Sequence, residues 1–327
     1  MAALRGKALV AYLLVCVFWG STYLAIRVGV AVLPPFLFAG TRFLLAGLLL
    51  LAGALASGAR LPRRAADWRT LVVVGLFLLA GGNAMVVWAE QFTPSGVASL
   101  FVVTVALWMA LFDSAMPGGG RLSWRVIVGL LIGLAGTALL VGADPRQLLH
   151  ADLRGPLALT GASASWAFGS VYYKRHHADG SPYVGAAIEM AAGGVVVILL
   201  GLLLGEARHL HVTSRGLAAL GYLIVFGSVV GYTAYNYALH HASATIVGTY
   251  AYVNPLIAVL LGAVILGEHV GPRTGVAMAL ILGAVVWIQL AHRTPAARPA
   301  QAPPGDEAAP RVWSAAGRAG VRAASLD

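Results

Sequence analysis

The stretch Phe18-Trp19-Gly20-Ser21-Thr22-Tyr23-Leu24-Ala25-Ile26-Arg27 has a counterpart in the second half of the chain. Trp166 lies 147 positions after Trp19, and Lys174 lies 147 positions after Arg27. In both segments an aromatic residue is followed by small and hydroxyl residues and then by an apolar run that ends in a cation. Self-similarity at a fixed offset indicates a repeated structural unit. Because this unit is roughly half the chain, the sequence predicts a duplicated fold.

The repeat relation extends beyond this stretch. The same offset relates Arg42 to Glu189, two ionisable residues of opposite sign. Farther along the chain the offset drifts to 149, and it then relates three further pairs, Gly82 with Gly231, Trp88 with Tyr237, and Leu107 with Leu256.

Composition indicates a membrane protein. Of the 327 residues, 59% are hydrophobic and 10% are charged, and the mean hydropathy is +0.83. Soluble domains carry roughly 25% charged residues. The net charge of +10 does not indicate a nucleic-acid partner, because the cations lie in short loops and in the C-terminal region instead of forming a basic stripe. The one cysteine, Cys16, lies in an apolar run and excludes a disulfide framework within the chain.

Ten apolar segments are long enough to cross about 30 Å of hydrocarbon as helices. The first follows Arg5 and Lys7, and because no small-residue cleavage pattern comes after it, we expect an uncleaved helix and not a signal peptide. The predicted fold class is therefore an all-α integral membrane protein with ten transmembrane helices. The segments are Ala8–Val30, Pro35–Ala56, Leu71–Glu90, Gly96–Ala115, Val126–Gly142, Gly155–Tyr173, Pro182–Leu204, Gly216–Leu239, Ala244–Leu266 and Thr274–Ala291.

Ten helices divide into two sets of five, and an odd number of crossings makes the second set enter the membrane from the opposite side. The sequence therefore predicts two inverted five-helix repeats, residues 1–145 and 153–291, as in many secondary transporters. A count of nine or eleven helices would remove this symmetry. Residues 292–327 are rich in Pro, Ala and Arg, and we expect them to form a disordered cytoplasmic tail.

Loop charges predict the orientation. With a cytoplasmic N-terminus, the inner loops carry ten Lys and Arg residues without the tail, and the outer segments carry six. By the positive-inside rule, this bias predicts a plasma (inner) membrane protein with both termini in the cytoplasm.

Two charged residues lie well inside predicted helices. Arg42 and Glu189 each occur eight positions into a span, where a charge costs about 3 kcal/mol or more. Each could reach the interface or a backbone carbonyl. Alternatively, both face the interior, where they would pair or bind the two ends of a zwitterionic substrate. Glu90 and Asp113 lie near span ends, and we expect them to reach interfacial water.

Aromatic and polar residues near mid-span are the remaining binding candidates. Some aromatic side chains belong to interfacial belts, whereas others would line a mostly apolar small-molecule pocket. Pro255 lies in the middle of the ninth span, where it removes a backbone donor and kinks the helix, either for packing or as part of a gate. The candidate substrate-binding set is Trp19, Thr22, Arg42, Trp108, Trp166, Glu189, Tyr232, Asn236, Tyr252 and Asn254.

No enzyme motif is found. Patterns for hydrolases, zinc peptidases and phosphate-binding loops are missing from the sequence, so we expect no catalytic residue, no metal ligand and no cofactor. A transporter is the favoured function. A membrane-embedded enzyme acting on lipid-linked substrates would need a nucleophile or a metal site, and a channel would share some of the same features.

Three groups of residues together resemble the EamA-type permeases of the drug/metabolite transporter superfamily. They are the segment Phe18-Trp19-Gly20-Ser21-Thr22-Tyr23, then Pro34-Pro35 with Ala39-Gly40-Thr41-Arg42-Phe43, and finally Tyr250 to Ala258 with Gly262 and Gly267-Glu268. The resemblance covers residues 8–291. It departs from the family pattern at Ala106, where a proline is common, and at Gly118-Gly119-Gly120, which replaces a Gly-Glu pair.

This resemblance implies a ten-helix inverted repeat with cytoplasmic termini and alternating access through a central cavity. The implied function is secondary transport of small organic metabolites, amino-acid-like or drug-like, by an exporter or exchanger. The expected partners are a small-molecule substrate and the lipid bilayer, and the chain would act as a monomer or a homodimer.

Overall fold

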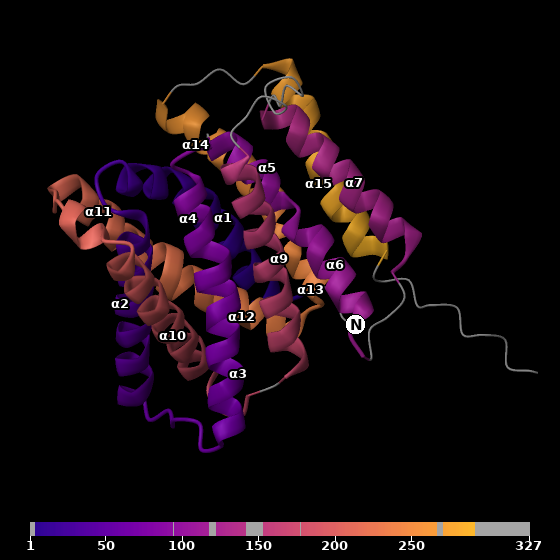
Figure 1. Cartoon of the computed structure of the whole chain (residues 1–327). Coiled ribbons are helices and arrows are strands. Elements are labelled where there is room, and N and C mark those ends of the chain that lie inside the picture. Colours follow the sequence, from indigo (N-terminus) through magenta and orange to yellow (C-terminus); the bar gives the residue numbers. More distant parts are fainter. Residues whose placement is uncertain are drawn as a thin grey trace, which may run out of the picture. The chain divides into compact units, whose positions relative to one another are not determined.

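The computed structural model describes residues 4–93, 95–117, 122–141, 153–176, 178–266 and 271–291. Every regular element within these ranges is helical (Figure 1). Several predicted features lie outside the described residues: the end of the first repeat, Gly118-Gly119-Gly120, Gly267-Glu268 and the tail at 292–327.

The helices of the first half follow the predicted segments. Pro35, at the first position of its helix, has the backbone angle that a helix start requires and no N–H to leave unpaired. The third predicted segment is one continuous rod made of three elements. The elements are α1 (Lys7–Val30), α2 (Pro35–Ala56), α3 (Ala65–Gly75), η1 (Leu76–Ala84), α4 (Met85–Ala89), α5 (Ser95–Val103), α6 (Val105–Ala115) and α7 (Trp124–Val141).

The second half repeats this order. Pro182 starts its helix as Pro35 does, and the hydroxyl of Thr213 caps the next rod by accepting the N–H of Gly216 at 3.1 Å. The elements are α9 (Arg154–Arg175), α10 (Pro182–Leu203), the short helix η2 (Glu206–His209), α11 (Ser214–Tyr222), η3 (Leu223–Val230), α12 (Gly231–His241), α13 (Ala244–Gly248), α14 (Tyr250–Leu266) and α15 (Pro272–Ala291).

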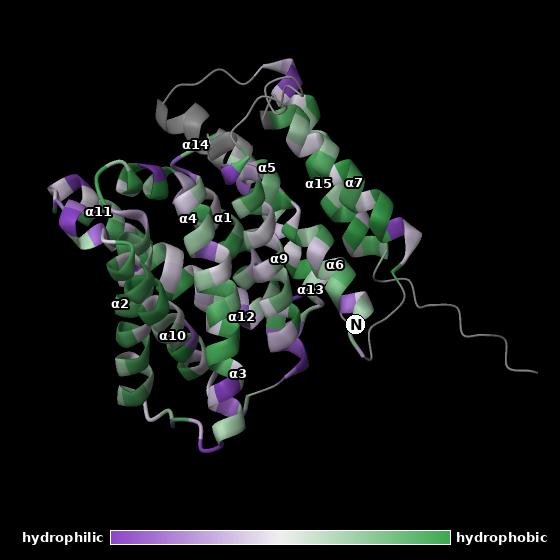
Figure 2. Cartoon of the chain, in the orientation of Figure 1, coloured by the Kyte–Doolittle hydropathy of each residue, from purple (hydrophilic) through white to green (hydrophobic). Residues whose placement is uncertain are grey.

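The helices carry the apolar surface of a multi-pass membrane protein. Five helical segments of the described chain are long and apolar enough to span a membrane: Lys7–Val30, Pro35–Ala56, Ala65–Ala89, Pro182–Leu203 and Ser214–His241. Three further apolar helices, Leu100–Ala115, Trp124–Leu140 and Pro272–Ile288, are shorter. Figure 2 shows that α2 and α10 consist mostly of hydrophobic residues. Large apolar side chains stay exposed on their outward faces, including Leu48 and Leu49 of α2 and Leu199 and Leu203 of α10, where hydrocarbon would cover them.

The equivalent helices α2 and α10 cross in close contact through small residues. A methyl group on Gly40 would lie 2.9 Å from the carbonyl oxygen of Gly194, and one on Gly47 would lie 2.8 Å from that of Ala187. Since 147 positions separate Gly47 from Gly194 and Gly40 from Ala187, each contact is the symmetry mate of the other. Residue numbers rise along α2 as they fall along α10, so the two helices run antiparallel.

A second pair of equivalent helices, α7 and α15, also crosses antiparallel (Figure 1). Gly129 of α7 packs against Trp287 and Ile288, and Gly136 packs against Leu280 and Ile281. Antiparallel contact between equivalent helices is the arrangement that two inverted repeats produce.

Contacts between the helix ends fall into two groups. At the first end, which we call the Arg64 end, Arg64 pairs with Asp179 at 3.0 Å and Arg175 pairs with Asp113 at 2.8 Å. At the second end, the Glu206 end, the Glu206 carboxylate accepts the backbone N–H of Leu37 at 2.8 Å. Segments that alternating crossings would place on the same side of a membrane therefore meet in the structure.

Candidate substrate site

A cavity of about 70 Å³ lies between the two halves of the protein. At roughly 10–15 Å³ for each water molecule, it has room for about five waters, which is the space that a small organic molecule takes. Its wall combines aromatic and aliphatic side chains with a few polar groups, as small-molecule sites usually do. The residues that line it are Trp19, Thr22, Tyr23, Ile26, Arg42, Phe43, Leu79, Gly82, Asn83, Val86, Val102, Val105, Ala162, Ser163, Trp166, Gly227, Tyr232, Tyr250 and Asn254.

One stripe of α1 shows where the cavity lies along the molecule. Val15, Trp19, Thr22 and Ile26 are spaced by four, three and four positions, so they share one helix face. Trp19, Thr22 and Ile26 line the cavity, whereas Val15 is fully buried in the core. The cavity therefore extends from the middle of α1 toward the Glu206 end, whereas the same face of α1 is packed at Val15, toward the Arg64 end.

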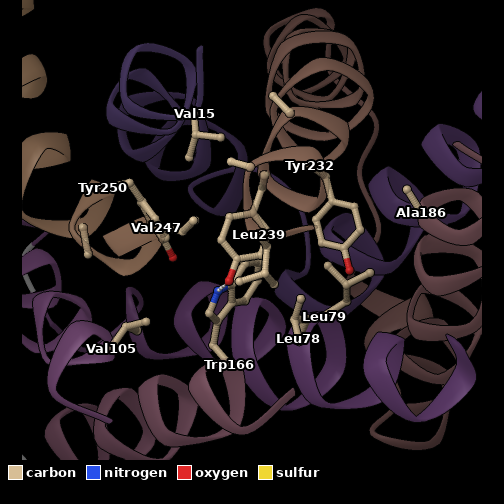
Figure 3. Packing of buried hydrophobic residues seen from close by; sticks show 14 of the residues in the cluster. Val15, Leu78, Leu79, Val105, Trp166, Ala186, Tyr232, Leu239, Val247 and Tyr250 are labelled. Carbon is tan, nitrogen blue, oxygen red and sulfur yellow. Dashed lines mark hydrogen bonds between the residues drawn. The ribbon is translucent and has the colours of Figure 1, made fainter. Parts of the chain in front are cut away.

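The two tryptophans related by the repeat meet at this cavity. The rings of Trp19 and Trp166 are 5.3 Å apart between centroids, in an edge-to-face arrangement at 84°. Each ring packs against a glycine of the other half: Trp19 against Gly231 and Trp166 against Gly82. These glycines are themselves repeat equivalents, so the pseudo-two-fold axis passes between the two tryptophans. In Figure 3, Tyr232 and Tyr250 lie on opposite sides of Trp166.

Both halves carry a π-helical segment beside the cavity. The segments η1 and η3 begin at Leu76 and Leu223, which are 147 positions apart. A π-helix widens the backbone spiral and is frequent at functional sites. Here η1 contributes Asn83 to the cavity wall and η3 contributes Gly227.

Arg42 projects from α2 into the cavity wall. Its side chain is 3% exposed, and its Nε donates to the Ser228 hydroxyl at 2.8 Å. Its guanidinium carbon lies 4.8 Å from the centroid of the Phe43 ring, within the range of a cation–π contact.

Glu189 lies close to the cavity but does not line it. Its Oε2 accepts hydrogen bonds from the Tyr232 hydroxyl at 2.8 Å and from Asn236 Nδ2 at 2.7 Å. Tyr232 lines the cavity and so connects the buried carboxylate to its wall. Its other oxygen, Oε1, is buried and has no hydrogen-bond partner in the structure.

A polar ladder on the rod formed by η3 and α12 serves both charged residues. Ser228, Tyr232 and Asn236 are spaced by four positions and share one face of this rod. Arg42 bonds to the first of them and Glu189 to the other two. The described structure contains no ion pair between Arg42 and Glu189, so each charged group has partners of its own.

Six of the ten residues predicted for substrate binding line the cavity: Trp19, Thr22, Arg42, Trp166, Tyr232 and Asn254. Glu189 is one hydrogen bond behind the wall, through Tyr232, and Asn236 is one further, through Glu189. In the orientation that satisfies its neighbours, the Asn254 amide nitrogen donates to the carbonyls of Tyr250 at 3.1 Å and Cys16 at 3.2 Å. The predicted kink residue Pro255 follows it inside α14.

Trp108 and Tyr252 lie elsewhere. Tyr252 is two positions from both Tyr250 and Asn254, and at about 100° per residue this places it on the opposite side of α14. Its hydroxyl donates to the Leu130 carbonyl at 2.8 Å. Trp108 is three positions past Val105 toward the Arg64 end, where the cavity has ended, and it stacks on Phe112 at 5.8 Å.

Among the lining residues outside the predicted set, three have a signal in the sequence: Tyr23, Asn83 and Tyr250. Tyr23 is adjacent to Thr22, and Tyr250 is one helical turn from Asn254. Asn83 is a lone amide in an apolar helix, next to the repeat glycine Gly82. Its side-chain oxygen is buried without a hydrogen-bond partner.

Comparison with known families decides the class of protein. Residues 6–142 and 153–290 each match the model of the EamA-like transporter family. The chain belongs to the EamA-like transporter family. The resemblance identified from the sequence is thus confirmed, and this EamA-like transporter is a transporter and not an enzyme.

Relatives of this EamA-like transporter have similar descriptions. The inner membrane transporter YedA of Escherichia coli (strain K12) is 40% identical over 292 residues, which cover 88% of this chain and 92% of YedA. A probable amino-acid metabolite efflux pump of Salmonella typhimurium is 28% identical, with 78% and 86% of the two chains covered. A protein of known crystal structure is 25% identical, with a TM-score of 0.72 over 88% of this chain and 98% of that one. The chain is accordingly a multi-pass inner membrane protein.

Proposed function

We propose that this EamA-like transporter is a secondary carrier of small organic metabolites, amino-acid-like or drug-like, that works as an exporter or exchanger by alternating access. The observation that carries the proposal is the cavity beside the contact of Trp19 with Trp166. This cavity extends toward the Glu206 end, and α1 is packed toward the Arg64 end. The efflux pump named among the relatives supports the choice of metabolites. A comparison of metabolites in medium and cytosol, with and without the gene, tests it, because an exporter shifts its substrate toward the medium.

The closed layer is built from hydrogen bonds on the Arg64 side of the two tryptophans. The Tyr12 hydroxyl and the Thr249 hydroxyl are 2.8 Å apart and join the first half to the second. Tyr235 hydrogen-bonds to Ser170 at 2.6 Å and accepts from Trp166 Nε1 at 3.1 Å. Such neutral, reversible contacts suit a gate, and a cavity that extends toward one end only favours a carrier over a channel, whose path would be continuous.

The proposed topology has ten crossings in two inverted repeats, with both termini and the Arg64 end in the cytoplasm. The antiparallel crossings of α2 with α10 and of α7 with α15 support the inversion. The concentration of Arg60, Arg63, Arg64 and Arg69 at the Arg64 end supports the orientation.

Reporter fusions test this topology. Fusions after Arg64, Lys174 and Arg293 are expected to give cytoplasmic signals, and fusions after Asp144, Arg208 and Arg273 external signals, because the charge bias orients the helices. A cytoplasmic signal after Asp144 would exclude a five-helix first repeat.

Pro255→Ala is expected to leave the protein inserted and to slow turnover more than it weakens substrate binding. The proline interrupts α14 directly after the cavity residue Asn254, where α14 is close to Gly20 of α1, and conformational steps often limit such proteins. Initial rates and half-saturation concentrations in reconstituted vesicles measure the two effects. Pro272→Ala, at the start of α15, is the matched control. Normal turnover by a well-expressed Pro255→Ala variant would assign the kink to packing alone.

A further inference from the structure

We infer that the cavity is an anion site, and that it takes small organic carboxylates with an apolar or aromatic body, held by Arg42. The inference rests on the proposed carrier function and names the substrate class of that same site. It is argued from the cavity wall, which contains the cation Arg42 and no acidic residue, and not from the names of related proteins.

The first observation is that the guanidinium of Arg42 keeps most of its donors free for a ligand. A guanidinium has five N–H donors and stays charged at any physiological pH. The hydrogen bond to Ser228 uses Nε, and the described protein supplies no acceptor to the two terminal nitrogens. The ion pairs Arg64–Asp179 and Arg175–Asp113 lie at the Arg64 end, and within the described part of the chain no acidic side chain pairs with Arg42.

Ser228 and Phe43 hold this guanidinium in place. Ser228 is fully buried and fixes Nε, so the edge that carries the terminal nitrogens is left for the cavity that Arg42 lines. The Phe43 ring packs against the guanidinium carbon at 4.8 Å. A planar fork held in this way matches a carboxylate, which can accept two parallel N–H bonds.

The second observation is that no acidic side chain lines the wall. Glu90, which we expected to reach interfacial water, is instead buried with both carboxylate oxygens lacking a hydrogen-bond partner among the described residues, and it does not line the cavity. The lining residues include neither aspartate nor glutamate. The nearby Glu189 is separated from the cavity by Tyr232, to which it is hydrogen-bonded. A ligand ammonium group would therefore lose its hydration and gain no counter-charge, and it would share the cavity with Arg42.

The rest of the wall fits an apolar ligand body with one hydrogen-bond donor. Trp19, Trp166 and Tyr250 present aromatic surface to the cavity. Asn83 contributes a buried side-chain oxygen that has no hydrogen-bond partner in the structure and accepts a ligand N–H or O–H. The apolar surface accommodates the ligand body, and Asn83 favours a ligand with an N–H or O–H group on that body, whereas the preference for a carboxylate comes from Arg42.

Three probes with one body and three charges test the inference on the full chain in lipid nanodiscs, with titration calorimetry as the readout. They are 3-phenylpropanoate, its neutral amide 3-phenylpropanamide, and the cation 3-phenylpropylamine. We expect the acid to bind at least tenfold more tightly than the amide and the amine. Arg42→Gln is expected to reduce the affinity for the acid to that for the amide, while Arg42→Lys keeps part of the preference. Ser228→Ala is expected to weaken acid binding by a smaller factor, because the cation remains but is less well held.

Equal affinities for the acid and the amide, or a preference that persists in Arg42→Gln, would overturn the anion site. So would failure of the wild type to bind the acid. If Arg42→Gln does not fold, the acid-to-amide ratio of the wild-type protein decides the question alone. The carrier proposal fails separately, when deletion of the gene leaves the distribution of every metabolite unchanged. Gene-dependent export of neutral or cationic solutes only would keep the carrier and remove the anion site.

Discussion

Glu189→Leu is expected to reduce the folded yield and the melting temperature of the detergent-solubilised protein strongly. The substitution removes the acceptor of two buried donors, the Tyr232 hydroxyl and Asn236 Nδ2. Each unsatisfied buried donor costs about 1–3 kcal/mol, so the expected loss is several kcal/mol.

Two further variants separate hydrogen bonding from volume. Glu189→Gln keeps an acceptor oxygen and the size of the side chain, and it is expected to melt close to the wild type. Adding Tyr232→Phe to Glu189→Leu is expected to recover part of the loss, because one of the unpaired donors has then been removed. A Glu189→Gln variant as unstable as Glu189→Leu would instead show that the negative charge itself stabilises the fold.

Arg42→Gln is expected to lower transport at least tenfold while the protein still folds. The charge of Arg42 has no acidic partner in the described structure, so burying it costs desolvation free energy that a neutral side chain avoids. The Gln amide can also hydrogen-bond to Ser228. Substrate flux in reconstituted vesicles and the melting temperature measure the two effects. Arg175→Gln, which affects the Arg64 end and not the cavity, is the control for loss of an arginine.

The same assays decide whether Arg42 and Glu189 depend on each other. From the sequence, a direct pair or a shared zwitterion predicts that the double variant Arg42→Gln with Glu189→Gln recovers part of the folding loss or fails only in transport. Because each group has separate partners on the Ser228–Tyr232–Asn236 ladder, we now expect additive effects in both assays. A double variant whose melting temperature or transport departs from the sum of the two single effects would contradict this.

The sequence predicts the helices well because two strong signals agree there. Apolar segments show where each helix lies, and the offset that relates Trp19 to Trp166 shows which helices are equivalent. The repeat relation, whose offset is 149 at Gly82 and Gly231, also agrees with the contacts at the centre, since each of these equivalent glycines packs against the tryptophan of the other half.

The composition of the site is less predictable, because it depends on the direction in which each side chain points. Tyr252 was grouped with Asn254 although two positions along a helix point to opposite sides. The π-helical segments cannot be recognised from the hydropathy of the sequence, yet they place Asn83 and Gly227 in the cavity wall. The hydrogen-bond partners of Arg42 and Glu189 lie on the rod of η3 and α12 and not on α2 or α10. The two charges considered without these partners indicate a direct pair. The spacing of Ser228, Tyr232 and Asn236 was the signal that would have indicated otherwise.

Cysteine labelling on α1 tests most directly whether the cavity is reached in turn from the two sides of the membrane. Ile26 lines the cavity, whereas Val15 is fully buried on the same helix face toward the Arg64 end. Ile26→Cys and Val15→Cys are made singly in a Cys16→Ser background and treated with a membrane-impermeant maleimide in right-side-out and inside-out vesicles. We predict that Ile26→Cys reacts only from the external face and Val15→Cys only from the cytoplasmic face. Reaction of either position from both faces at similar rates would reveal a continuous pore and contradict the account.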